Sequence, residues 1–249
     1  MNRHEIAAYI PFVLDRRAAA DAVHAYIGAR QPPAAAHDAL PPEALRAVYV
    51  PFWRFYGAVT CDYQGAWEEE EDYQDSAGDW QTDVNRHYID GTTDYNIDGA
   101  VLICAAAAYA GVCDERLPYD FSQAESDVPP DADAGDIVPC TITAEAAWQE
   151  AKERLQEYLT ARLARELCED YDTQSAEIHT LNSSYMDISA ECLLLPLWEV
   201  SFASAGRTHT VYVNGQTGKV YGNLPPAAPR AGCFAAAATL LFLSLVFLH

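Results

Sequence analysis

Alternation of hydrophobic and polar residues is clearest between positions 53 and 64. One side of an extended chain there carries Trp53, Phe55, Gly57, Val59, Cys61 and Tyr63. A period of two is typical of a half-buried antiparallel strand. After an acidic turn at 68–79, β-branched and aromatic residues recur from 82 to 97, which favours a strand that returns beside the first. This part of the chain therefore predicts a long hairpin.

Two other stretches have the pattern of helices. Asp15 precedes an alanine-rich run to Gly28, which indicates a helix with an acidic N-cap and a glycine at its end. Thr143 is the N-cap of a second predicted helix, in which apolar residues recur every three or four positions. These residues are Trp148, Ala151, Leu155, Leu159, Leu163 and Leu167. The stripe predicts an amphipathic helix that covers a sheet.

Short apolar runs complete the secondary structure. The run 101–109 predicts a short buried helix. Three strands, joined by turns that contain glycine, are predicted further on. They comprise residues 193–202, 208–213 and 219–221.

The order of these elements predicts an α+β fold. Similar strings precede both helices and open two strands: Ile10-Pro11-Phe12, Val138-Pro139-Cys140, Val50-Pro51-Phe52-Trp53 and Leu195-Pro196-Leu197-Trp198. Their recurrence indicates two helix-then-antiparallel-hairpin units that arose by internal duplication, with chance recurrence as the alternative. The predicted units are 1–110 and 111–224, followed by a proline-rich linker at 225–230 and a C-terminal apolar helix at 231–249.

Residues 231–248 contain no charged side chain and are just long enough to cross a hydrocarbon core. This predicts a transmembrane anchor, with a buried C-terminal helix as the alternative. A core helix of this length would normally show a polar face, which favours the anchor. Arg230 precedes the stretch, and a cationic flank favours the cytoplasmic side. The N-terminus lacks the apolar core of a secretory signal, so the globular part is expected in the cytoplasm.

The charge balance restricts the partners. The chain has 15 Lys and Arg against 37 Asp and Glu, a formal net charge of −22. Because this charge repels phosphate backbones, no nucleic-acid partner is expected for this segment. Acidic residues concentrate in 62–98 and 114–136. The sequence therefore predicts a protein partner, and a basic one if electrostatics guide the encounter.

No residue cluster matches a catalytic or metal-binding motif. The seven cysteines form no Cys-x-x-Cys pair, and Gly215 and Gly218 are too close together for a phosphate loop. The acidic run 68–79 is interpreted as a solvated hairpin tip, with calcium binding as the alternative. The sequence thus predicts no enzyme, cofactor or metal. An unrecognised metal-binding hydrolase stays open, because active sites assemble from distant residues.

Five strings resemble a family of bacterial proteins that usually carry N-terminal zinc ribbons and often end in a membrane segment. The strings lie at 48–53, 117–122, 151–155, 194–198 and 212–220. Members are sometimes labelled primosomal or replication-restart-helicase-like. This chain lacks the cysteine-rich ribbons, so functions that depend on them are not expected. The C-terminal helix, strand and Thr217-Gly218-Lys219-Val220 hairpin also resemble the PepSY domain, which is associated with peptidase propeptides and cell-envelope proteins. The resemblance implies architecture but no catalytic residues.

Trp53 and Trp198 each lie just after a proline near the start of a predicted strand. Such residues are either core anchors or the floor of a peptide-binding groove. The predicted partner-binding surface comprises Trp53, Phe55, Trp198, Phe202, Glu69 and Glu71. The predicted function is that of a non-catalytic, membrane-tethered protein-binding or scaffold protein. The alternatives are a PepSY-like modulator of a peptidase or envelope enzyme, and a metal-binding hydrolase.

Overall fold

The computed structural model describes residues 6–30, 41–112, 118–126, 135–204, 207–222 and 224. Its helices are α1 (Arg16–Arg30) and α2 (Ala144–Asp170), with 3-10 turns η2 (Pro42–Ala44), η3 (Ala107–Tyr109) and η4 (Phe121–Gln123). Its strands are β1 (Ile6–Tyr9), β2 (Arg46–Gln74), β3 (Trp80–Cys104), β4 (Asp136–Ile137), β5 (Ser175–Ser204), β6 (Arg207–Asn214) and β7 (Val220–Gly222). These strands form one sheet in the order β3-β2-β5-β6-β7, with β1 parallel to β5 and β4 parallel to β2.

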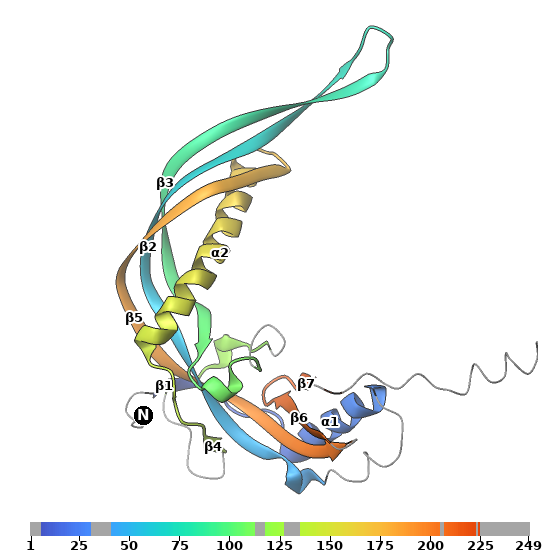
Figure 1. The fold of residues 1–249 in the computed structure, drawn as a ribbon, viewed down its shortest axis with the longest axis vertical. Coiled ribbons are helices and arrows are strands. Elements are labelled where there is room, and N and C mark those ends of the chain that lie inside the picture. The colour runs from blue at the N-terminus through green and yellow to red at the C-terminus, as the bar shows by residue number, and fades with distance from the viewer. Residues whose placement is uncertain are drawn as a thin grey trace, which may run out of the picture.

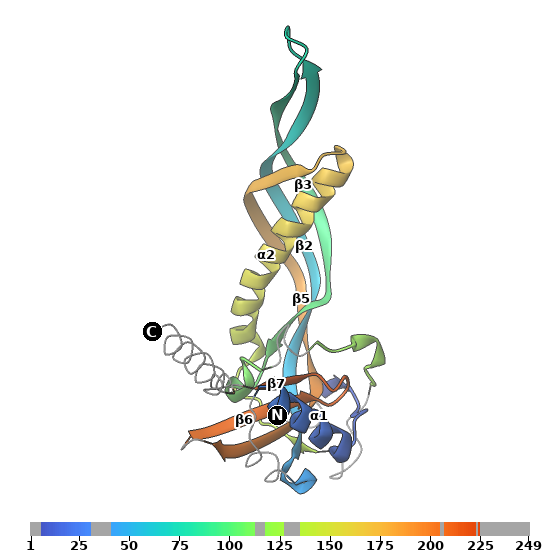
Figure 2. The same cartoon turned by 90° about the vertical axis from the view of Figure 1, so that its right-hand side faces the viewer.

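Three very long strands dominate this sheet. β2 is antiparallel to both of its long neighbours, pairing with β5 from Arg46 to Glu68 and with β3 from Phe52 to Gln74. The three strands bend into an arc, and α2 lies along its concave side (Figure 1). A view at 90° shows that the same strands twist around one another as they rise (Figure 2). Such a twist is expected of long strands built from L-amino acids.

The helix α2 covers the concave face of the arc. The Thr143 hydroxyl accepts a hydrogen bond from the Ala146 N–H at 3.3 Å, which confirms the predicted N-cap. The stripe that faces the sheet is buried and comprises Ala147, Ala151, Leu155, Leu159, Leu163 and Leu167. Its first turns pack against buried side chains of β2 and β3, namely Phe55, Val59, Cys61, Tyr95, Ile97, Val101 and Ile103. The prediction of an amphipathic helix over a sheet is confirmed.

The shorter helix α1 is also confirmed, but its predicted end at Gly28 is wrong, because the helix continues to Arg30. The Asp15 carboxylate accepts a hydrogen bond from the Ala18 N–H at 2.8 Å and so forms the predicted N-cap. The buried side of this helix consists of Ala19, Ala20, Val23 and Ile27. It packs against residues of β5 and β6, which are Trp198, Val200, Val211 and Val213.

Both helices therefore cover strands from the other half of the chain. α1 precedes β2 and β3 in sequence but packs on β5 and β6. The fully buried partners of α2 lie on β2 and β3, and α2 also packs on the half-buried Leu181, Tyr185 and Ile188 of β5. Both helix starts are tied to the sheet in the same way. The Trp198 indole N–H donates to the Leu14 carbonyl at 3.1 Å, and the Trp53 indole N–H donates to the Ile142 carbonyl at 2.8 Å. Each carbonyl belongs to the residue just before an N-cap, so each tryptophan fixes where a helix begins.

The predicted fold class is wrong in its arrangement. The chain does not form two helix-then-hairpin units, because strands from both halves join in one continuous sheet. The protein is thus dominated by an antiparallel sheet rather than being an α+β pair of repeats. The physical reason is the pairing of β2 with β5, a contact between distant segments that local patterns do not specify. The predicted apolar helix at 231–249 lies outside the described residues.

The predicted hairpin at 53–97 is confirmed and is longer than expected, since β2 and β3 stay paired from Phe52 to Gln74. The predicted helix at 101–109 is wrong. Residues 101–104 continue β3, and only η3 follows. The reason is that Val101 and Ile103 fill the core beneath α2 as strand residues.

A membrane anchor is not supported. No helix in the described part of the chain is long and apolar enough to cross a membrane. The predicted linker at 225–230 and anchor at 231–248 both lie outside the described residues. The localisation and the membrane partner that followed from this anchor are withdrawn with it.

The crossed helices predict that the halves of the chain cannot fold separately. Fragments 1–114 and 115–224 should each lack a cooperative thermal transition, because each exposes apolar surface that the other covers. Mixed together, the two fragments should regain the transition of the intact 1–224 chain. Circular dichroism melts of each fragment and of the mixture test this. A cooperative melt of either fragment alone would contradict it.

A second prediction concerns the far end of α2. The Tyr95 hydroxyl and the Arg162 guanidinium donate to the Glu166 carboxylate at 2.6 and 2.8 Å. Burial alone would raise the pKa of Glu166, but these hydrogen bonds lower it below its ordinary value. A carboxyl with a lowered folded-state pKa stabilises the fold above its unfolded pKa, and this contribution disappears as pH falls through the folded value.

Glu166→Gln should therefore lower the melting temperature at neutral pH, and the difference from wild type should shrink as the pH falls from about 5 to about 3. Thermal melts across this range measure the effect. Glu157→Gln, which removes an exposed carboxylate from the same helix, is the matched control. A difference from wild type that is the same at every pH would refute the role of the charged carboxylate.

Candidate functional site: the β2–β3 arm

Beyond Glu68 and Arg86, the sheet narrows to two strands. The last residue of β2 that pairs with β5 is Glu68, opposite Ser175, whereas pairing with β3 continues to Gln74 opposite Trp80. We call residues 69–85 the arm. Both views show the arm projecting past the end of α2 (Figures 1 and 2). Since a two-stranded hairpin is marginally stable alone, its two ends need support.

The tip of the arm is a defined turn. The Asp75 carboxylate accepts hydrogen bonds from the N–H groups of Ala77 at 2.9 Å and Asp79 at 3.0 Å. The bond from the Asp79 N–H is the main cause that lowers the pKa of Asp75. Gly78 has a φ of +88°, a left-handed conformation that favours glycine. Asp75 and Gly78 together hold the turn without contacts to the rest of the fold.

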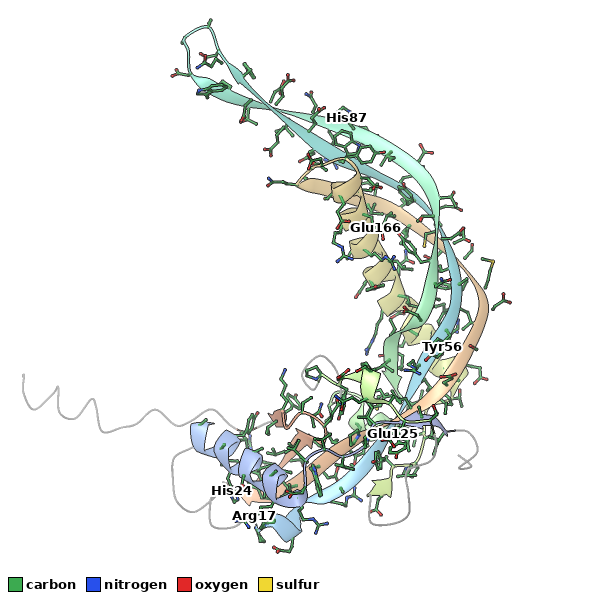
Figure 3. The ribbon with its side chains drawn as sticks, turned by 180° about the vertical axis from the view of Figure 1, so that it is seen from behind. Arg17, His24, Tyr56, His87, Glu125 and Glu166 are labelled. Carbon is green, nitrogen blue, oxygen red and sulfur yellow. The ribbon has the colours of Figure 1, made fainter. Side chains whose placement is uncertain are left out.

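The base of the arm is held by stacked rings. Trp67 stacks on His87 with 4.2 Å between ring centroids and on Tyr171 with 4.6 Å. His87 also contacts the Glu69 carboxylate at 3.0 Å. His87 lies where the hairpin leaves the body, beyond Glu166 of α2 (Figure 3). The end of α2 and the start of the arm are therefore joined by one aromatic stack.

Ion pairs reinforce the same junction on the other face of the sheet. The Arg86 guanidinium lies 2.7 Å from the Glu177 carboxylate of β5 and 3.9 Å from that of Glu68. The Thr173 hydroxyl, in the turn after α2, donates to the Glu68 carbonyl. Such exposed pairs contribute little stability individually, but they fix the position of β3 against β5.

Three large apolar side chains are exposed along β3. Trp80, Val84 and Tyr88 are 70, 50 and 78 % exposed, and they lie four residues apart on the face that points away from α2. We call them the apolar row. Single exposed apolar residues are ordinary on protein surfaces, whereas three on one face of a strand form a candidate interaction site.

The surroundings of the apolar row are strongly acidic. Residues 62–98 contain twelve Asp and Glu side chains and one Arg. On the same face of β3, the exposed residues Asp90, Asp94 and Asp98 are also four residues apart, beginning two residues after Tyr88. Of these, Asp94 accepts a hydrogen bond from the Thr60 hydroxyl at 2.6 Å. On this face, the end at 80–88 carries the apolar row with Thr82 and Arg86 between its members, and the end at 90–98 is anionic.

The predicted surface residues do not come together. Trp53 and Phe55 lie beneath the start of α2, where Phe55 is buried against Trp148. Trp198 is buried beneath the start of α1, and Phe202 is half-buried beside His209. Of the six predicted residues, Glu69 and Glu71 alone lie on the arm, and both are exposed.

Each of the two tryptophans is a core anchor that also lines a surface hollow. The hollow beside Trp53 has a volume of about 640 Å³ and includes Cys140, Ile142 and Ala190. A hollow of about 480 Å³ beside Trp198 is lined by Phe12 and Tyr49 among others. Both hollows open beside the helix starts. Neither lies near the arm.

Three titratable groups of the core have raised pKa values. Burial raises the pKa of the Cys104 thiol to about 11 and that of Tyr49 to about 12, so both remain protonated near neutral pH. Tyr109, which donates to the Glu199 carboxylate at 2.6 Å, also has a raised pKa because it is buried. Within the described residues, no three His, Cys, Asp or Glu side chains are grouped as metal ligands.

The chain is similar to Uncharacterized protein YdjG of Bacillus subtilis (strain 168). The two are 25% identical over 214 residues, which cover 83% of this chain and 60% of that protein. The chain therefore spans about three fifths of the length of the curated relative that it matches. No family model matches the chain, and no solved structure matches it.

Sequence reasoning missed the apolar row. Its signal was present, because Trp80, Val84 and Tyr88 recur at an interval of four within a predicted returning strand. An interval of four places residues on one face of a strand, as well as near one face of a helix. The weak alternation and the charged neighbours concealed it.

The aromatic stack predicts that Trp67→Ala loosens the arm without unfolding the body. Aromatic pairs contribute about 0.5–1.5 kcal/mol each beyond burial, so the arm should open more often. Hydrogen exchange should accelerate at 69–74 and 80–85 while the melting temperature changes little. Tyr73→Ala, which removes an exposed ring from the arm away from its base, is the control. Unchanged exchange in Trp67→Ala would exclude the stack as the support.

Proposed function

We propose that this protein is a binding protein whose arm and outer strand β3 capture a basic protein partner. The observation that carries the proposal is the apolar row, exposed on a projecting strand within an acidic surface. Exposed aromatic side chains with a charged surround are the usual composition of a binding hot spot. The role is one of binding rather than catalysis.

Shape supports this assignment. The arm extends past α2 (Figure 1) and carries Trp80 and Val84 beyond the body, while Tyr88 lies at its base beside His179 of β5. A partner can reach these exposed side chains without displacing other elements. The tip turn and the stacked base hold the two strands in one conformation. A surface that is ordered before binding loses less entropy when the partner binds.

Charge supports the choice of partner. Twelve carboxylates against one Arg over residues 62–98 give this region a strong negative potential. Such a field accelerates encounter with a cationic partner and rejects anionic ones. Burial of Trp80 and Tyr88 would then supply affinity, while the carboxylates supply selectivity.

The other functions expected from the sequence gain no specific support from the described residues. A PepSY-like modulator and a metal-binding hydrolase stay predictions. Kinship with the zinc-ribbon-bearing bacterial proteins also stays a prediction.

The proposal is tested with a fluorescein-labelled peptide of alternating lysine and valine, measured by fluorescence anisotropy. The intact protein should bind it, and more weakly as salt rises, because salt screens the acidic surface. The double variant Trp80→Ser/Tyr88→Ser should bind about tenfold more weakly, since hot-spot residues contribute most of the affinity.

Met186→Ser is the matched control, because it removes an exposed apolar side chain from β5, away from the row. It should bind like wild type. Equal binding by the double variant and wild type would refute the site. Equal binding of a peptide with glutamate in place of lysine would refute the choice of a basic partner.

A further inference from the structure

We infer that the partner binds as an added strand along the outer edge of β3, opposite Trp80–Asp98. The inference rests on the proposed function and specifies its geometry. The ligand is an extended peptide segment. One of its faces carries apolar side chains toward one end of the segment and Lys or Arg toward the other end.

The outer edge of β3 is available for pairing. β3 is the last strand of the sheet order, and in the described part of the chain it pairs with β2 alone. One row of its backbone N–H and C=O groups therefore has no neighbouring strand. The nineteen residues from Trp80 to Asp98 span roughly 60 Å, far more than a short edge strand. Proteins normally shorten, bend or cover such edges, because an exposed edge templates another strand.

This edge is also the regular one. Pairing between β2 and β3 runs without a register shift from Tyr56 opposite Asp98 to Gln74 opposite Trp80. The other long edge, along the first part of β5, is interrupted by two register shifts against β2. At one of them, Asp187 has a φ of +52°, a left-handed conformation. Bulges of this kind discourage strand addition, so β3 is the edge that remains open to a partner.

The side chains of β3 define what the added strand must carry. Residues of neighbouring strands that lie opposite each other contact on the same face. On the face away from α2, a partner strand would meet the apolar row at one end and Asp90, Asp94 and Asp98 at the other. Apolar side chains suit the first end, and Lys or Arg suit the second. The partner strand must therefore run so that its apolar end lies beside the apolar row and its basic end lies beside the three aspartates.

A second copy of this chain does not fit the edge. Antiparallel self-pairing over the full length, centred on Ile89, would place Trp80 opposite Asp98. It would likewise place Val84 opposite Asp94 and Tyr88 opposite Asp90. Parallel self-pairing in register would place each carboxylate opposite its own copy, and like charges opposite each other destabilise a sheet. Charge complementarity therefore selects a basic strand from another protein.

Backbone methylation of a peptide tests strand addition separately from side-chain docking. Successive amides of an extended strand point to opposite edges, so methylation of every second amide blocks one edge only. Three peptides with identical side chains are compared by fluorescence anisotropy with the intact protein. They are apolar at one end and lysine-rich at the other, and they are unmethylated, methylated on one edge, or methylated on the other.

The unmethylated peptide and one methylated peptide should bind with similar affinity, and the other methylated peptide should bind at least about tenfold more weakly. In parallel, NMR hydrogen exchange should show new protection at every second amide of 80–98 when the unmethylated peptide binds. Equal affinities for the two methylated peptides would overturn strand addition while the proposed function survives. If the unmethylated peptide also fails to bind, the proposed function itself fails.

Discussion

β2 pairs with β5 along most of its length, and this antiparallel ladder positions every other element. Val50 lies opposite Leu195 near its lower end, and each is buried. On one side of the ladder β4 and β3 add to β2, and on the other side β1 and β6 add to β5. Because the two central strands come from opposite halves of the chain, neither half has a complete core until they pair. The crossed packing of α1 and α2 follows from the same pairing.

The length of these strands also explains the uneven cover of the sheet. A helix rises 1.5 Å per residue and a strand about 3.3 Å, so α2 spans much less of the arc than strands of similar residue count. The concave face beside α2 is therefore apolar, while the arm beyond it is mostly polar, apart from Tyr73, Trp80 and Val84. The hairpin beyond the helix needs other support, and the stack of Trp67, His87 and Tyr171 provides it. The projecting arm is thus a direct consequence of covering a long sheet with one helix.

Local elements were predictable from the sequence, and their assembly was not. Thr143 and Asp15 are caps in the structure because capping depends on neighbouring residues alone. The run 101–109 was assigned to a helix because short apolar segments have no decisive period. The acidic run 68–79 predicts a turn, yet residues 68–74 belong to β2 because they pair with β3, and their carboxylates stay exposed there. Of the predicted site residues, Glu69 and Glu71 lie on the arm. Trp53 and Trp198 instead have a structural role, because their indole N–H groups donate hydrogen bonds at the starts of the two helices. The row of Trp80, Val84 and Tyr88 could be recognised only once the strand was known to extend past its neighbours.

The acidic residues of β3 reconcile two demands on an exposed strand edge. An edge this long would pair with its own kind if it were neutral, and exposed aromatic side chains would strengthen that tendency. Carboxylates spaced along the same face oppose self-pairing in either direction. In antiparallel pairing they would lie opposite the apolar row, and in parallel pairing each would lie opposite its own copy. The same carboxylates attract a strand that carries Lys or Arg at matching positions. Under the proposed function, a single set of charges would thus oppose self-pairing and select the partner.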